Sequence, residues 1–492
     1  TFYYKRRDNS LSELPLLEGV LKYIKENNIS FCMPGHKNGR GFYNTSIGRE
    51  FISNILKFDI TEVDGVDNLH NQKSIILDAS KRLSKLYGSK KSYFLVNGGT
   101  SGNMIMLFSS FNEGDKVLVE RNCHSSILNG IIMRKLIPIY LENIISEKIN
   151  APICINLEHF LQALKENKDI KGIVVTYPNY YGICSNLKFI IKEAKKLNIK
   201  VLVDCAHGAH FGINKNLPES AVTLGADMVV TSSHKTLPSL TQTAYLHVNN
   251  EKYIDKVDFY YNAFLSTSPS YIALCSMDYA RFYLEKYGSS DYEKLIEIAE
   301  YYRNKINSIR GLQVIGRKDI IQFNSKEKKA VPSAADIDLT RYTINLEPGY
   351  SGNLLLNYLR KLNIQCEMSD NSNLVLIFSP FNEKEEFERL YTVLKNCDLE
   401  RIKCKKVNRM KYGIPQSKMI PFQVIDVEKE MVDLNNSCGR ISGASVIPYP
   451  PGVPILSMGE MIDKSVIQVI KYYIKNSMDL IGVKDNKIKV VK

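Results

Sequence analysis

The sequence has no tryptophan, no CxxC pair and no apolar run long enough to cross a bilayer. The N-terminal segment has no apolar block followed by a small-residue cleavage site, so we expect no signal peptide. The ten cysteines follow no regular spacing, which argues against a disulfide framework or a zinc site and favours reduced thiols. No basic stretch alternates with aromatic residues, and the net charge of +13 is spread over solvated helical faces. We therefore expect a cytoplasmic protein with no membrane or nucleic-acid partner.

The pattern along the chain predicts an α/β core followed by smaller domains. At 492 residues and 44% hydrophobic content, the chain can form two or three domains. Short apolar runs alternate with helical patterns between about residues 90 and 250, which is typical of a mostly parallel sheet. The runs are SYFLVNG, KVLVER, GIVVTYP, KVLVDCAHG and DMVVTSSHK.

We expect four segments, with a hinge near residues 285–291 and a Pro-rich turn, VIPYPPGVPIL, in the last segment. The segments are an N-terminal part contributing to the dimer and the active site (1–70), a large domain (71–288), a small α+β domain (289–397) and a C-terminal domain (398–492).

Three residue groups fall where strands of the core are predicted to end, which is where active sites of such sheets form. NGGTSGN precedes a helical run, and its glycines with Thr100 and Ser101 can hold a small phosphate or merely cap the helix. RNCHSS places His124 beside this cradle, as a ring that stacks on a flat group or as a capping residue. VDCAHGAHF ends its strand with Asp204. A metal site on Cys205, His207 and His210 is the less favoured alternative, because the cluster has no distant fourth ligand.

A fourth group, VVTSSHKTLPSLTQ, places Lys235 at a strand end one βα unit after Asp204. The four groups together predict a pyridoxal phosphate site. The lysine can condense with the aldehyde, the cradle can hold the phosphate, the flat imidazole can stack on the ring, and the carboxylate can keep the pyridine nitrogen protonated. Ser232 and His234 can add donors to the phosphate. Burial would lower the pKa of Lys235 and favour its nucleophilic, unprotonated form.

Eight motifs occur in a characteristic order along almost the whole chain. They are MPGHKNG, DGVDNLH, FLVNGGTSGN, RNCHSS, VDCAHGAHF, SSHKTLPSLTQ, LSTSPSY and PYPPGVPIL followed by GEMI. In these motifs the sequence resembles the bacterial ornithine/lysine/arginine decarboxylases, which have the aspartate-aminotransferase-like fold (fold-type I). The chain begins too close to PGHK to hold the flavodoxin-like N-terminal wing of the long members, so it looks like the shorter Gram-positive type.

The resemblance implies roles for individual residues. Lys235 would carry the covalent link to the cofactor, Asp204 would pair with the pyridine nitrogen, and His124 would stack on the ring, with His234 as a further catalytic residue. In an obligate homodimer, Thr267 and Ser268 would reach the cofactor of the partner subunit. The implied cofactor-binding set is Gly99, Thr100, Ser101, His124, Asp204, Ala206, His207, Ser232, His234, Lys235, Thr267 and Ser268, with no metal.

The implied reaction is decarboxylation of a basic amino acid, after which Lys235 or His234 returns a proton to the α-carbon. The distal cation of the substrate needs an acidic partner in a desolvated pocket. Our first candidate is Glu460, with Asp64 and Asp67 behind it; each could instead cap a turn or form a structural ion pair. These three acids and His36 form the expected substrate-binding set, Glu460, Asp64, Asp67 and His36.

The substrate we favour is L-arginine, which gives agmatine for polyamine synthesis, with lysine or ornithine as the alternative. If Arg341 held the substrate carboxylate, an aminotransferase would be the better hypothesis. A non-catalytic regulator that binds pyridoxal phosphate is a further alternative. The sequence departs from the family pattern at two positions. Ala444 stands where many members have a polar or acidic residue, which bears on substrate choice, and Met458 stands where the family often has a proline, in the loop before GE.

Overall fold

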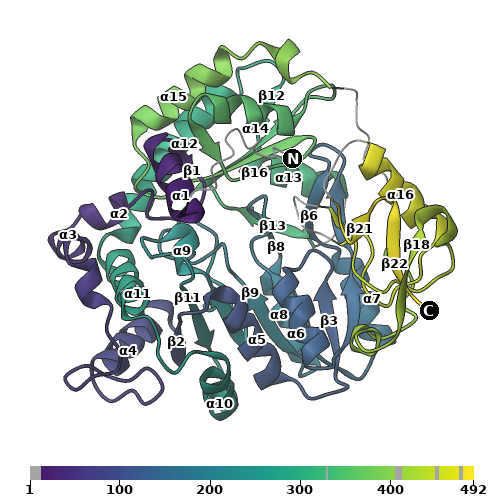
Figure 1. Cartoon of the computed structure of the whole chain (residues 1–492), viewed down its shortest axis with the longest axis horizontal. Helices are drawn as coiled ribbons and strands as arrows, with labels where there is room; N and C mark the ends of the chain where they lie inside the picture. The colour runs from purple at the N-terminus through teal and green to yellow at the C-terminus, as the bar shows by residue number, and fades with distance from the viewer. Residues whose placement is uncertain (1–12, 328–330, 405–412, 449–453, 476–479) are drawn as a thin grey trace.

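Seven strands form the central sheet of this computed structural model, which describes residues 13–327, 331–404, 413–448, 454–475 and 480–492 (Figure 1). Six strands are parallel, and the seventh, β11, runs antiparallel to both of its neighbours. The predicted mostly parallel sheet is therefore confirmed. In spatial order the strands are β2 (Lys91–Leu95), β11 (Ala244–Val248), β10 (Met228–Thr231), β9 (Lys200–Asp204), β7 (Ile170–Thr176), β3 (Lys116–Glu120) and β4 (Ile137–Leu141).

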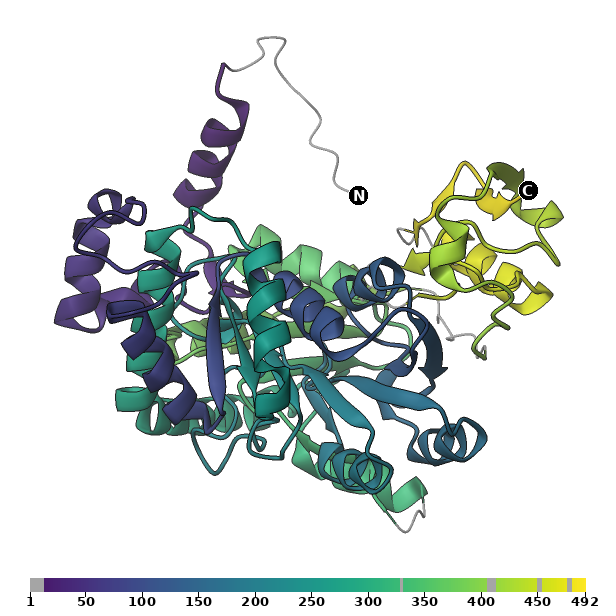
Figure 2. The ribbon, with the colours of Figure 1, turned by 90° about the horizontal axis from the view of Figure 1, so that it is seen from below.

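Helices cover both faces of this sheet (Figure 2). Strands β9 and β10 are buried almost throughout, which explains why they read as continuous apolar runs rather than alternating ones. The helices of this domain are α4 (Ile75–Tyr87), α5 (Gly98–Ser110), α6 (Ser125–Met133), α7 (Leu157–Glu166), α8 (Leu187–Lys196), α9 (Ser233–Thr236), α10 (Ile254–Phe264) and α11 (Tyr271–Tyr283). Short antiparallel pairs join β5 (Asn143–Ser146) to β6 (Ala151–Ile155) and β8 (Ile183–Ser185) to β13 (Ala334–Ile337).

A long helical path connects the large domain to the small one. Helix α11 continues through a single π-helical turn, Leu284–Gly288, directly into α12 (Ser289–Ile306). The expected hinge near residues 285–291 is thus an irregular turn inside a continuous helix, and no chain break separates the two domains there. Such π-turns insert one extra residue into the helical ladder.

The small domain is built on an antiparallel sheet in the order β12-β14-β17-β16. An additional parallel pair joins β1 (Ile29–Phe31) near the N-terminus to β15 (Ile364–Cys366). This pair ties the N-terminal segment to the small domain. The elements are β12 (Leu312–Val314), α13 (Arg317–Glu327), β14 (Arg341–Leu346), α14 (Gly352–Lys361), β16 (Met368–Ser369), β17 (Asn373–Ile377) and α15 (Lys384–Lys395).

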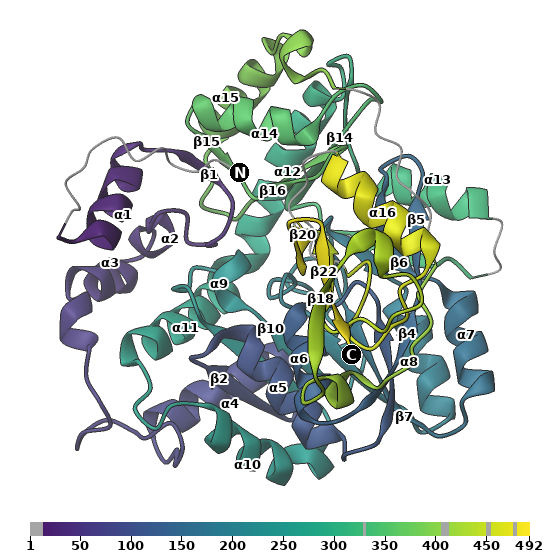
Figure 3. The same ribbon diagram turned by 45° about the vertical axis from the view of Figure 1, so that its right-hand side comes forward.

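The last part of the chain forms a separate unit with its own hydrophobic cluster (Figure 3). Its three-stranded sheet has the order β18-β22-β21, and α16 supplies buried apolar residues to the cluster. Residues 449–453 of the Pro-rich turn lie outside the described residues, so the turn is only partly placed. The elements are β18 (Lys429–Asp433), β19 (Ile447–Pro448), α16 (Lys464–Lys475), β20 (Leu480–Ile481), β21 (Val483–Lys484) and β22 (Lys487–Val491).

Helix α1 (Pro15–Lys25) projects from the rest of the molecule (Figure 2). This helix has no buried residue, although Leu16 and Ile24 are apolar and 80% and 61% exposed. Helices α2 (Arg40–Tyr43) and α3 (Ser46–Ser53) bury Phe42 and Phe51 against α11. Large exposed apolar side chains of this kind mark surfaces that contact another protein.

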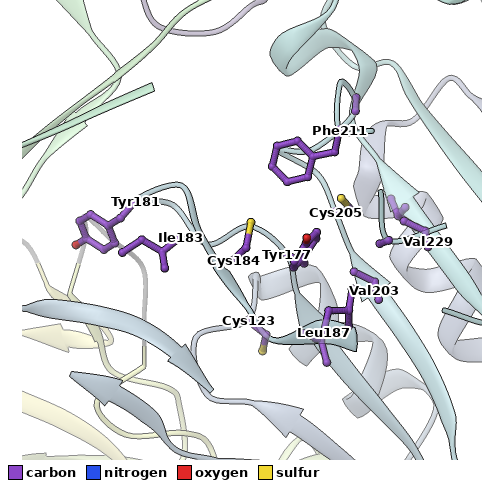
Figure 4. Packing of buried hydrophobic residues seen from close by; sticks show 14 of the residues in the cluster. Cys123, Tyr177, Tyr181, Ile183, Cys184, Leu187, Val203, Cys205, Phe211 and Val229 are labelled. Carbon is purple, nitrogen blue, oxygen red and sulfur yellow. The ribbon is translucent and has the colours of Figure 1, made fainter. Parts of the chain in front are cut away.

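Buried cysteines pack among apolar and aromatic side chains in the main core. Figure 4 shows Cys123, Cys184 and Cys205 in this packing. All ten cysteines are free thiols. Among the described residues, no cluster of histidine, cysteine and acidic side chains is arranged to hold a metal ion, and no helix is both long and apolar enough to span a bilayer.

Candidate active site

A cavity of about 630 Å³ opens at the carboxyl ends of the parallel strands, where the four sequence groups converge. Two isoleucines of the C-terminal unit, Ile447 and Ile481, form part of its wall. The remaining lining residues are Asn97, Gly98, Gly99, Thr100, Asn103, Asn122, Cys123, His124, Ser125, Thr176, Pro178, Tyr180, Asp204, Ala206, His207, Ser232, His234, Lys235, Thr241 and Gln242.

Lys235 lies in the short helix α9, directly after β10, and its amine faces this cavity. Its Nζ lies 3.1 Å from Nε2 of His207. Burial lowers the pKa of Lys235, while the carboxylate of Asp204 opposes this shift. The predicted strand-end lysine is therefore placed as the sequence indicated.

The MPGHKNG motif holds α9 from the outside. The backbone N–H of Gly35 donates to the carbonyl of His234 at 2.7 Å. A Cβ at Gly35 would come within 2.6 Å of the Leu237 carbonyl oxygen, so only glycine allows this loop to pack so closely. The motif thus fixes the short helix that carries Lys235.

Asp204 ends β9 and is only 3% exposed. Asn103 donates to its Oδ2 at 2.9 Å, and the backbone N–H of Ala206 donates to its Oδ1 at 3.1 Å. These two donors fix the orientation of the carboxylate. Each oxygen retains a lone pair, so the carboxylate can still accept a proton-bearing ring nitrogen.

The first turn of α5 borders the same cavity and has no side-chain cap. Its leading N–H groups have no acceptor within the helix. That of Gly98 donates to the Gln242 carbonyl at 2.8 Å, and those that follow it can bind an anion. Gly98 has a φ of 68°, and a Cβ at Gly99 would lie 2.8 Å from Oγ of Ser232. Thr100 lines the cavity, whereas Ser101 is buried and donates to the Gly98 carbonyl. The Ser101 hydroxyl is thus engaged within its own helix turn.

His124 caps a helix and also lines the cavity. Its Nδ1 accepts from the backbone N–H of Ser126 at 3.2 Å and lies 2.8 Å from the Ser126 hydroxyl, so it caps α6. Its ring also lines the cavity. Burial lowers the pKa of His124, which keeps the imidazole neutral. Stacking on a cofactor ring stays a prediction.

His234 lines the cavity next to Lys235, but its hydrogen bond limits what it can donate. Its Nδ1 lies 2.7 Å from the Thr243 carbonyl oxygen, which can only accept, so Nδ1 carries a proton. Burial lowers the pKa of His234 to about 4, so the ring is neutral and Nε2 bears no proton. In this state His234 can accept a hydrogen bond in the cavity, and donation to a phosphate requires the ring to be protonated first.

The acidic residues expected to bind the substrate are not in the cavity wall. Both carboxylate oxygens of the buried Glu460 are bound by Arg121, at 2.6 and 2.9 Å. Asp67 accepts backbone N–H groups from the loop before α4 and from its first turn, including those of Lys73 and Ser74. Asp64 is exposed on the surface of the turn before them.

The other predicted residues lie around the cavity rather than in it. Half-buried His36 accepts from Gly39 N–H through Nδ1, on the loop that packs against α9. Thr267 and Ser268 are exposed between α10 and α11. Ala444 and Met458 belong to the C-terminal unit and do not line the cavity. A role for Thr267 and Ser268 in a partner subunit stays a prediction.

Some residues in the wall were not assigned from the sequence, and Arg341 was considered only as a candidate ligand of the substrate carboxylate. Asn103 follows Gly99 by one helical turn and so faces the same side, a spacing that could have revealed it. Arg341 lies behind His207, with Nη2 3.3 Å from its Nδ1, and its side chain is completely buried. Tyr180 comes from a loop that has no sequence signal for this site, whereas Gln242 ends the motif SSHKTLPSLTQ, although no role was predicted for it.

The donor set fits a flat phosphorylated pyridine aldehyde. The uncapped end of α5 offers N–H groups to a phosphate, Asp204 offers an oriented carboxylate, and Lys235 offers an amine with a lowered pKa. All three border one cavity. The arrangement can thus bind and activate such a group.

Comparisons with known proteins agree with this arrangement. A family described as "Orn/Lys/Arg decarboxylase, major domain" matches residues 14–386, and "Orn/Lys/Arg decarboxylase, C-terminal domain" matches residues 406–480. An arginine decarboxylase of Bacillus anthracis is 32% identical over 98% of this chain and 97% of that protein.

Solved structures show the same fold. The constitutive lysine decarboxylase of E. coli superimposes with a TM-score of 0.76 at 20% identity, over 97% of this chain and 82% of that one. A variant structure described as "SPT with PLP" superimposes with a TM-score of 0.55 at 15% identity, over 75% of this chain and 86% of that one.

Proposed function

Since the chain belongs to the Orn/Lys/Arg decarboxylase family and decarboxylates a basic amino acid, we propose that its substrate is L-arginine and its cofactor pyridoxal 5'-phosphate. The products are then agmatine, for polyamine synthesis, and carbon dioxide. The observation that carries this proposal is the shared cavity of Lys235, Asp204 and the uncapped α5 terminus. Arginine is favoured over lysine or ornithine because the near-full-length Bacillus relative is named an arginine decarboxylase, whereas the lysine decarboxylase of E. coli is more distant.

Several wall residues would hold the cofactor. Lys235 would carry the covalent link, Asp204 would hold the protonated ring nitrogen, and His124 would face the ring. Ser232, Thr100 and the N–H groups of Gly99 and Thr100 would hold the phosphate. The bound pyridinium supplies an electron sink for the pair that remains on the α-carbon when carbon dioxide leaves.

Lys235 is the better candidate for returning a proton to the α-carbon. Its Nζ can carry a proton into the cavity, whereas His234 already donates its Nδ1 proton to the Thr243 carbonyl. Because burial lowers the pKa of His234 to about 4, its Nε2 has no proton to give near neutral pH. We therefore assign the final proton transfer to Lys235 rather than His234.

The position of Arg341 supports decarboxylation over transamination. Its guanidinium is completely buried, donates to the Tyr180 carbonyl at 2.8 Å and contacts His207. A substrate carboxylate in the cavity would thus meet His207 before Arg341. Without a guanidinium to hold it, the carboxylate is free to leave as carbon dioxide.

A second copy of the chain would complete the substrate site. Asp204 is the one carboxylate in the described cavity wall, and the cofactor would occupy it. Glu460 and Asp67 already have partners, which leaves exposed Asp64 as the candidate for the guanidinium of arginine, supplied across a homodimer interface. Thr267 and Ser268 would approach the partner's cofactor in the same assembly.

Apolar surface on the N-terminal side supports this homodimer. Leu16 and Leu56 are 80% and 84% exposed, and an apolar cavity of about 570 Å³ lies between α3, α4 and α11. Exposed patches of this kind mark protein interfaces. The free thiols support a reducing compartment, and we propose the cytoplasm.

The test is carbon dioxide release from arginine, lysine and ornithine, measured side by side with added pyridoxal phosphate. We expect agmatine from arginine to dominate, a visible absorbance band on cofactor addition, and borohydride trapping of the cofactor on Lys235. Equal rates with all three substrates would refute arginine preference. Keto acid formation in place of carbon dioxide would reject decarboxylation, and a colourless protein would reject the cofactor.

A further inference from the structure

Behind the amine of Lys235, buried polar side chains form a chain of contacts that ends on Arg341. Nζ of Lys235 lies 3.1 Å from Nε2 of His207, and Nδ1 of His207 lies 3.3 Å from Nη2 of Arg341. His207 and Arg341 are 4% and 1% exposed. The imidazole thus bridges the guanidinium and the amine.

The chemistry of the guanidinium decides which nitrogen of His207 carries the proton. Arginine has only N–H donors and stays protonated, so Nδ1 of His207 must accept from Arg341. Burial, which is the largest cause, and the charge of Arg341 hold the pKa of His207 well below its usual value, so the ring is neutral. A neutral imidazole has one proton, which therefore sits on Nε2 and faces Nζ of Lys235. An unprotonated amine can accept this hydrogen bond, whereas an ammonium group cannot.

Arg341 is itself held by fixed partners. It donates to the Tyr180 carbonyl at 2.8 Å, and its Nε lies 3.5 Å from Oδ2 of Asp338. Asp338 is bound in turn by the Thr340 hydroxyl at 2.7 Å. The guanidinium therefore cannot easily turn away, and His207 has no alternative proton position that satisfies both of its neighbours.

We propose that, before the cofactor is bound, Arg341 and His207 are a positioning pair that keeps the Lys235 amine unprotonated and directed into the cavity. When pyridoxal phosphate is present, such an amine would be ready to condense with its aldehyde carbon near neutral pH, with the carbonyl oxygen leaving as water. The inference rests on the proposed function for its biological meaning. Its physical content, an amine kept neutral by a donated hydrogen bond, can be measured without the cofactor.

Other charged or titratable groups also act on the Lys235 amine. Acidic groups favour its protonated form, whereas Arg341 disfavours it. The groups from all elements around it are Asp204 on β9, Glu367 between β15 and β16, His124 at the start of α6, His234 on α9, Arg341 on β14 and His207 after β9.

Two amide substitutions separate the nitrogens of His207. In His207→Gln the side-chain amide can place an N–H donor near the former Nε2 position, so the contact with Lys235 is kept. In His207→Asn the shorter side chain reaches only the former Nδ1 position. Arg341→Met removes the donor that sets the proton on Nε2. A merely structural role for His207 does not predict that Gln and Asn differ in the pH profile of Lys235.

The measurement is trace labelling of the full-length, cofactor-free chain with acetic anhydride across pH 6 to 11, read by mass spectrometry at Lys235. Exposed lysines in the same samples provide the internal control. We expect wild type and His207→Gln to be half-labelled well below the ordinary lysine pKa. In His207→Asn and Arg341→Met we expect a midpoint about one pH unit higher, and hence about tenfold slower labelling at pH 7.

Uptake of pyridoxal phosphate, followed by its visible absorbance, is measured on the same proteins and should slow in parallel. Identical profiles in wild type, Gln and Asn variants would overturn the pair. A wild-type midpoint near that of the exposed lysines would also overturn it, even if every variant fails to fold. If the labelling differences appear but no protein takes up pyridoxal phosphate, the pair stands and the cofactor proposal fails.

Discussion

The ion pair between Arg121 and Glu460 links the large domain to the C-terminal unit, and replacing Glu460 with glutamine tests its role. Arg121 follows β3, next to residues that line the cavity. It binds Glu460 through Nη1 and Nη2, and it also donates to the carbonyls of Pro454 and Ile455. The Ser457 N–H adds a third donor to Glu460 at 2.6 Å. A glutamine keeps the shape but removes the negative charge.

The geometry sets the size of the expected effect. At 2.6 Å and an effective dielectric constant of about 20, the attraction of two unit charges is about 6 kcal/mol. The side chains of Arg121 and Glu460 are 8% and 1% exposed, so desolvation offsets much of this attraction. Removing one partner leaves the other charge buried alone, which costs about 3–5 kcal/mol. We expect Glu460→Gln to lower the free energy of unfolding by this amount.

Urea unfolding, followed by circular dichroism, measures this change, with an expected decrease in midpoint of about 1–2 M. The double variant Arg121→Met/Glu460→Met is the matched control, because it removes both charges and should recover much of the stability. If Glu460 instead binds the substrate cation, Glu460→Gln raises KM for arginine and leaves the urea midpoint unchanged. That result would refute the ion-pair reasoning.

Three further predictions concern the reaction and the pH dependence of stability. Lys235→Ala should abolish carbon dioxide release while circular dichroism shows an unchanged fold; residual turnover above the uncatalysed rate contradicts its role. Asp204→Asn should retain cofactor absorbance but lower kcat by about 10²-fold or more, and a near wild-type kcat contradicts the pyridinium contact. Burial lowers the pKa of Lys37 from 10.5 to about 8, so the folded chain binds fewer protons between these values. Between pH 8 and 10.5, the free energy of unfolding of wild type should therefore rise by about 3 kcal/mol relative to that of Lys37→Met. Urea unfolding at each pH measures this difference. A difference that stays constant with pH contradicts the burial cost.

The features that the sequence predicted are those encoded by local patterns. Strands such as β9 and β10 are continuous apolar runs, and their ends carry Asp204 and Lys235. Parallel pairing of β9 and β10 brings these ends together, so the spacing of one βα unit was sufficient to predict their common cavity. Strand β11 was missed because an antiparallel insertion has no local signal in an otherwise parallel pattern.

The parts of the site that could not be predicted depend on contacts between residues far apart in the sequence. Arg121 and Glu460 come from different domains, and nothing near either residue indicates its partner. From its type and motif, Asp67 was expected to bind the substrate. In the structure the following loop instead directs its backbone N–H groups onto the Asp67 carboxylate. The hydrogen bond that places a proton on Nδ1 of His234 could not be predicted for a similar reason, because its partner, the Thr243 carbonyl, belongs to the backbone.

The two isoleucines that the C-terminal unit contributes to the cavity make this unit part of the reaction chamber. Because its hydrophobic cluster is separate from the main core, it can open by local unfolding while the central sheet stays intact. Such opening would admit bulk water to the cavity, where the Lys235 amine owes its lowered pKa to burial. The packing of the C-terminal unit would thereby decide how much water reaches the cavity whose wall it completes.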